Sequence, residues 1–159
     1  MKRRPRITIR SLQRKLPLDG SALERFATEA LRLCLQIRRR KQTELQKATE
    51  ISVLLVGNRR MSALHRQFLG QSGATDVLTF QHGEIFINVE IAREQAQRFG
   101  SSLEREMRLY LVHGLLHLHG FDDRTPTEAK KMRQVQSKVL RQASRSIQRA
   151  NIPARSSLK

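Results

Sequence analysis

Residues 113–123 contain side chains whose types and spacing suit a metal site. They read H-G-L-L-H-L-H-G-F-D-D. His113 and His117 are four residues apart, so on a helix they lie on one face and can bind one ion. Gly120 can end that helix in a left-handed turn, which brings Asp123 back to the same ion. We therefore predict a metal held by His113, His117 and Asp123.

Three such ligands leave one coordination position for water, which is typical of a catalytic zinc site rather than a structural one. The spacing also matches H-E-x-x-H-x-x-G-x-x-H of the metzincin proteases, with aspartate as the last ligand. In those enzymes the glutamate after the first histidine is the general base, whereas this chain has Gly114 there. Peptide hydrolysis by that mechanism is therefore disfavoured. Two histidines and a carboxylate also bind Fe(II), so a non-haem iron enzyme is an alternative.

The two histidines and the polar residues next to them also have explanations other than metal binding. Two core histidines on an apolar helix are the plain alternative to a metal site, and the third ligand with the helix-ending glycine argues against it. His119 points away from His117 on a helix, which indicates a surface residue or a local hydrogen-bonding group. Asp122 is expected to cap the turn rather than bind the ion.

Other carboxylates are secondary candidates. Glu106 lies two helical turns before the first histidine on the same face, where it can orient a ligand, accept a proton or form a plain salt bridge. Thr75, Asp76 and Glu84 flank the expected strands and can line a cleft, although a turn residue and an exposed strand position explain the two carboxylates equally well.

The hydrophobic pattern predicts the elements that hold these groups. Strands are expected at 7–9, 51–56, 76–80 and 84–88, the last two forming a hairpin around Gly83. Helices are expected to begin at the capping residues Ser21, Asn58, Asn88, Ser101 and Thr125. This order indicates an α+β fold, with a small mixed sheet of about four strands packed with helices and the metal site at the end of a core helix.

The chain length and the net charge indicate the number of domains and the kind of binding partner. The 159 residues suit a single domain, 1–159, with a basic C-terminal tail at about 141–159. The chain has 31 Lys and Arg against 14 acidic residues, a net charge of +17, which favours a polyanionic partner such as nucleic acid. Aromatic residues make up only 4%, so contact through phosphates is expected rather than base stacking.

The lengths of the apolar segments indicate the cellular location of the protein. The basic start of the chain is not followed by an apolar stretch of signal-peptide length, and no apolar run is long enough for a membrane helix. Cys34 is the only cysteine and has apolar neighbours, so we expect a buried thiol with no disulfide partner. These features predict a cytoplasmic protein that does not bind membranes.

Residues 113–123 resemble the H-G-x-L-H-L-x-G-[YF]-D-H signature of the YbeY family of bacterial endoribonucleases, with aspartate in place of the last histidine. The resemblance extends to T-D-V-L-T-F at 75–80, to G-E-I-F-I at 83–87 and to Glu106. It implies a hydrolase with one zinc ion that cuts single-stranded RNA, matures small-subunit ribosomal RNA and acts in ribosome quality control. The expected partners are therefore ribosomal RNA and the small ribosomal subunit.

Two positions depart from the family pattern. Asp123 replaces the third histidine, and a carboxylate oxygen is still an accepted zinc ligand, although it lowers the net charge at the ion. Leu69 stands where many members have an arginine, and Arg66, one helical turn earlier, is our candidate to stabilise the phosphorane charge in its place. The alternative function is a metal-stabilised RNA- or ribosome-binding factor with little turnover.

Overall fold

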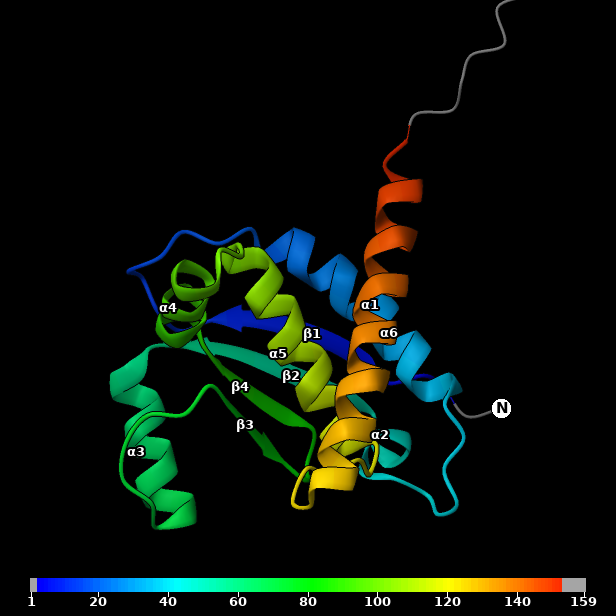
Figure 1. Ribbon diagram of the computed structural model, residues 1–159, viewed down its shortest axis with the longest axis horizontal. Coiled ribbons are helices and arrows are strands. Elements are labelled where there is room, and N and C mark those ends of the chain that lie inside the picture. The colour runs from blue at the N-terminus through cyan, green and yellow to red at the C-terminus, as the bar shows by residue number, and fades with distance from the viewer. Residues whose placement is uncertain (1–2, 153–159) are drawn as a thin grey trace, which may run out of the picture.

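The computed structural model describes residues 3–152, in which four strands and six helices follow one another (Figure 1). Their bounds are β1 Arg6–Ser11, α1 Gly20–Gln36, α2 Glu44–Lys47, β2 Glu50–Val56, α3 Asn58–Leu69, β3 Val77–Phe80, β4 Glu84–Asn88, α4 Val89–Phe99, α5 Leu103–Leu118 and α6 Pro126–Ala150.

The strands form one mixed sheet in the order β1-β2-β4-β3. β1, β2 and β4 are parallel, and β3 pairs antiparallel with β4 at the sheet edge. The hairpin between these last two strands turns at Gly83, whose φ of 92° suits glycine. The predicted α+β fold with a small mixed sheet is therefore confirmed.

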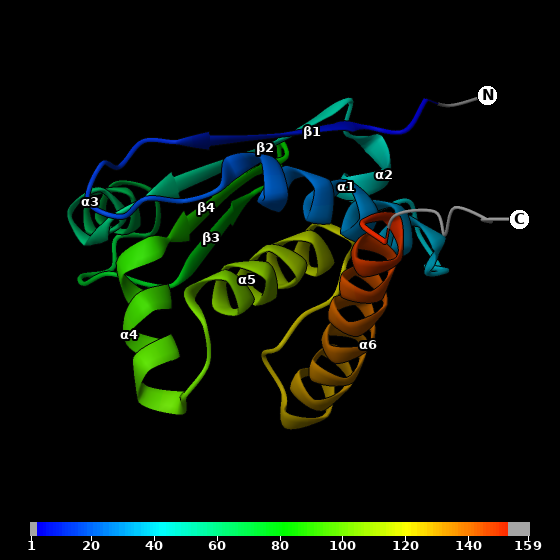
Figure 2. The ribbon, with the colours of Figure 1, turned by 90° about the horizontal axis from the view of Figure 1, so that it is seen from above.

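Alternate side chains of the strands enter two separate apolar clusters. Ile85 and Ile87 join the large cluster that includes buried residues of α1, α5 and α6. Phe86, between them, packs with Met61 of α3 in a smaller cluster. Because successive strand residues point to opposite faces, α5 and α3 cover opposite faces of the sheet. Figure 2 shows α5 running along the face that α1 also covers.

Three helices begin at caps other than those predicted. The side chain of Asp19, not Ser21, accepts from the backbone of α1, and Ser102, not Ser101, caps α5. Asn58 is already helical in α3, and its backbone N–H donates instead to Glu90 Oε2 of α4, at 2.6 Å. A cap that is supplied by a side chain of another helix leaves no pattern in the sequence around the capped helix. The caps at Asn88 and Thr125 are as predicted.

Helix α6 covers the first part of the segment predicted to be a basic tail. Residues 141–150 are its last turns, and Ala143 is completely buried. Helical packing on α1 explains why this segment is ordered although its exposed face is basic. Residues 153–159 of the predicted tail lie outside the described residues. None of the described helices has the length and apolarity needed to cross a membrane.

Candidate metal centre

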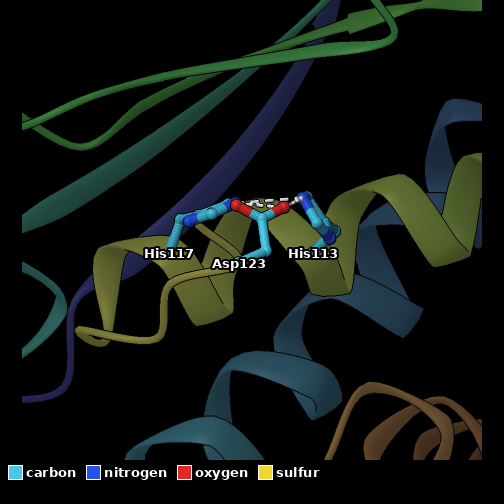
Figure 3. Close-up of side chains that lie close together, drawn as sticks. All are labelled: His113, His117 and Asp123. Carbon is cyan, nitrogen blue, oxygen red and sulfur yellow. Dashed lines mark hydrogen bonds and ion pairs between the residues drawn. The ribbon is translucent and has the colours of Figure 1, made fainter. Parts of the chain in front are cut away.

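The three predicted ligands meet at the C-terminal end of α5 (Figure 3). His113 and His117 lie on one face of the helix, with their Nε2 atoms 3.0 Å apart. Asp123 returns from the following loop, and its Oδ2 lies 3.8 Å from each of these nitrogens. One ligand atom of each residue lies within 4.8 Å of the others. This group could hold a metal ion at the end of a core helix.

The return of the chain depends on Gly120. Its φ is +85°, and its N–H donates to His117 O, while Phe121 N–H donates to Leu116 O. These two bonds form a Schellman turn, in which the residue after the helix adopts the left-handed conformation that glycine allows. The turn places Asp123 beside the histidines, as the glycine spacing predicted.

Each histidine ring is oriented by a hydrogen bond on its far nitrogen. His117 Nδ1 lies 3.1 Å from the carbonyl oxygen of Phe121, and His113 Nδ1 lies 2.8 Å from Gln136 Oε1 of α6. Both partners are acceptors, so each Nδ1 carries the proton and each Nε2 keeps its lone pair. Such outer contacts fix the tautomer in which a histidine binds metal. Gln136 was missed at the sequence level because it is 23 residues from His113.

Two lone pairs 3.0 Å apart repel one another unless a cation lies between them. Zinc–nitrogen bonds of about 2.0–2.1 Å in a tetrahedral site place two ligand nitrogens about 3.3 Å apart, close to the observed separation. Two imidazoles and a carboxylate are also a donor set that zinc accepts. The residues present therefore fit a single zinc ion, with small adjustments of Asp123.

The centre is open to solvent. The exposed side-chain fractions are 31% for His113, 25% for His117 and 46% for Asp123, so a substrate can reach all three. Burial, and next the proximity of His113, lower the pKa of His117 below its ordinary value. His117 is therefore neutral near pH 7, the form that binds metal.

Gly114 lies where α5 packs against the side chains of β3 and β4. A Cβ built on it would be 2.8 Å from Ile85 Cγ2 and 3.3 Å from Thr79 Cγ2. This position therefore has no space for the glutamate that acts as the base in metzincins. The structure agrees with the prediction that the chain does not use that mechanism.

Glu106 faces a different cavity from the metal centre. It lines a cavity of about 630 Å³ together with Thr75, Asp76 and Tyr110. Burial, with Asp76 and Glu106 nearby, raises the pKa of the Tyr110 hydroxyl above its ordinary value. The expectation that Thr75 and Asp76 line a cleft is therefore met, whereas Glu84 begins β4 opposite Phe80.

Arg66 lies exposed on α3, the helix on the opposite face of the sheet from α5. Leu69, at the position where the family pattern has arginine, is 53% exposed at the end of the same helix. Within residues 3–152, no hydrogen bond or ion pair joins the Arg66 guanidinium to His113, His117 or Asp123.

The prediction that His119 is a surface residue or a local hydrogen-bonding group is wrong. It is completely buried rather than on the surface, and its two bonds reach distant residues rather than local ones. Nε2–H donates to Ile37 O at 2.8 Å, and Nδ1 accepts from Thr43 Oγ1 at 2.9 Å. The helix ends at Leu118, so helical spacing no longer fixes the direction of this side chain. Asp122 accepts from Asp123 N–H at 2.8 Å, as expected of a turn residue.

Comparisons with known proteins show which family of proteins the sequence is similar to. A family model described as "Endoribonuclease YbeY" matches residues 8–144. Proteins named "Endoribonuclease YbeY" from Caldanaerobacter subterraneus and Frankia alni are 32% and 31% identical, over 80% and 76% of this chain and 91% and 71% of their own lengths. A protein of that name from Thermus thermophilus is 38% identical over 57% of this chain and 73% of its own.

The fold is also similar to a solved structure. A Thermotoga maritima protein determined in solution superposes with a TM-score of 0.62 at 27% identity, covering 96% of this chain and 99% of its own. The similarity therefore includes the sheet, helix α5 and the turn after it, which carry the candidate ligands.

Proposed function

Because this chain belongs to the YbeY family of endoribonucleases, we propose that it cleaves single-stranded RNA with one zinc ion held by His113, His117 and Asp123. The observation that carries the metal assignment is the convergence of two Nε2 atoms and one carboxylate at a solvent-accessible position, and this donor set suits zinc. A closed structural site would have four protein ligands and little exposure.

The protein residues contribute orientation and charge. When bound, zinc supplies Lewis-acid chemistry, which makes water a better nucleophile and polarises a phosphoryl oxygen. The Phe121 carbonyl and Gln136 hold the two histidine rings in the metal-binding tautomer. Arg66, which α3 carries on the other face of the sheet, is our candidate to stabilise the negative charge on the phosphoryl oxygens. Glu106, which lines a separate cavity, is our candidate to orient a group or accept a proton.

We also propose ribosomal RNA as the substrate, with the small ribosomal subunit as the partner and the cytoplasm as the location. The family membership supports an RNA substrate, and the net charge of +17 suits a large polyanion. The maturation of small-subunit RNA and ribosome quality control are the roles that the family resemblance implies.

Metal content and RNA cleavage should be measured together on the purified chain. We expect about one zinc per chain and cleavage of a labelled unstructured RNA, but not of the same sequence in a duplex. His113→Ala should lose both zinc and cleavage. Zinc without cleavage would instead favour an RNA-binding factor with little turnover, and iron as the bound metal would favour the facial-triad alternative.

A further inference from the structure

A basic cavity of about 680 Å³ opens beside the metal centre, between the segment after α1 and the end of α5. We call it the basic groove. Its wall includes the metal ligand His117 and five cationic residues, Arg38, Arg39, Arg40, Lys41 and Lys131. A chain bound in this groove therefore passes directly beside the metal centre.

The cations of the groove are available to a ligand. Arg38, Arg40, Lys41 and Lys131 are exposed. Within residues 3–152 no ion pair engages any of them, and the one acidic residue of the groove, Glu44, is 3.2 Å from Lys47. Like charges in consecutive positions repel one another, and a bound polyanion relieves that repulsion.

Arg39 has a different role from its neighbours. Its guanidinium lies 4.0 Å from the centroid of the Phe121 ring, and its NH2 group donates to Gly120 O at 2.8 Å. It therefore attaches the cationic run to the turn that positions Asp123. Because Arg39 covers this face of Phe121, the ring face is not available for base stacking.

His119 fixes the same segment at both ends. Its two ring nitrogens form hydrogen bonds with Ile37 and Thr43. These two residues flank residues 38–42, the segment that contains the cationic run 38–41. A charge run that served only solubility would need no such attachment. The buried histidine and Arg39 together hold the run against the metal-site turn.

We propose that the basic groove binds the phosphates of single-stranded RNA next to the bond that is cut. Arg38, Arg40 and Lys41 contact phosphates, and Arg39 and His119 are positioning residues. The groove reads the backbone rather than the bases, so binding is independent of sequence. This inference rests on the proposed function, because it assigns the path of that substrate.

The test compares two variants that each remove three positive charges. One carries Arg38→Gln, Arg40→Gln and Lys41→Gln. The matched control carries Arg14→Gln, Arg59→Gln and Arg60→Gln, which line another cavity at the start of α3. The probe is a fluorescein-labelled 2′-O-methyl oligouridylate, which resists cleavage, and its binding is followed by anisotropy across a salt series.

We expect the groove variant to bind about tenfold or more weakly at low salt, with the slope of log K against log salt reduced by about 2, since three contacts to a single strand contribute about 0.7 each. The control should keep nearly the parent slope, and both variants should keep their zinc. Equal losses in the two variants, or no loss in the groove variant, would overturn the proposal. If only the groove variant loses binding but the parent never cleaves RNA, the groove is still an RNA-binding site. The proposal that the protein is an endonuclease then fails.

Discussion

Gly114 lies so close to Ile85 that a Cβ on the glycine would be 2.8 Å from Ile85 Cγ2. The contact sets how near the metal-binding helix lies to the sheet. Gly114 lies between His113 and His117 in the chain, so the contact is made by the helical turn that carries both histidines.

We expect Gly114→Ala to lower the free energy of unfolding by up to about 2 kcal/mol, because an overpacking cost of about 1–3 kcal/mol is offset by a gain of about 1 kcal/mol from alanine in a helix. Urea denaturation of the single and double variants measures it. The cost should shrink in an Ile85→Ala background. Equal costs in both backgrounds would show that Ile85 is not the obstacle.

The ligand set predicts which variants lose zinc. Asp123→Ala should reduce zinc per chain as strongly as His113→Ala, after dialysis against a weak chelator. Asp122→Ala is the matched control and should retain zinc, because this side chain bonds within the turn. Asp123→His should also retain zinc, since imidazole is an accepted ligand. Loss of zinc from Asp122→Ala with normal content in Asp123→Ala would reverse the assignment.

Gln136 should matter for metal affinity although it is not a ligand. Gln136→Leu removes the acceptor of the His113 Nδ1–H bond, so zinc should bind about 10–100-fold more weakly. Gln134→Leu, on an exposed position of the same helix, is the control. Competition with a chromophoric chelator gives both dissociation constants. Equal constants would mean that the ring of His113 needs no support from α6.

Arg66 is tested separately from metal binding. Arg66→Ala should slow RNA cleavage about tenfold or more while zinc content stays normal, because only charge stabilisation is removed. Arg60→Ala, another exposed arginine of α3, should cleave like the parent. If Arg66→Ala also cleaves like the parent, an arginine on α3 is not needed and cations closer to α5 become the candidates.

Ionisation of Cys34 should make the free energy of unfolding fall as pH rises. Burial raises the pKa of its thiol to about 12 in the folded chain, whereas an exposed thiol ionises near pH 8.5. The unfolded chain therefore releases a proton first as pH rises, so this residue lowers stability above about pH 8.5, by up to about 1.4 kcal/mol per pH unit. The stability advantage of the parent over Cys34→Ala should shrink between pH 8 and pH 10. A constant difference would mean that the thiol ionises equally in both states.

Local patterns predicted the strands, most helices and the three candidate ligands, because each depends on residues close together in the chain. Gly120 is the clearest case, since a helix-ending turn and the spacing to Asp123 are both local. The cap that Glu90 provides to α3 depends instead on packing between two helices, and no sequence pattern indicates it.

The surroundings of the metal centre were less predictable. Four consecutive cationic residues at 38–41 do not by themselves indicate a binding site, and only the fold shows them beside His117. His119 was assigned the wrong environment because its partners are 76 and 82 residues away. Short-range periodicity cannot report such contacts.

The two hydrogen bonds of His119 have an entropic consequence for the groove. Fixing the backbone of one residue costs about 1–2 kcal/mol of conformational entropy, and a free loop would incur that cost each time a ligand ordered it. Here the fold has already ordered residues 38–42 between Ile37 and Thr43. The attraction of these cations for phosphate is therefore not reduced by ordering the loop, which is the advantage of a preorganised surface.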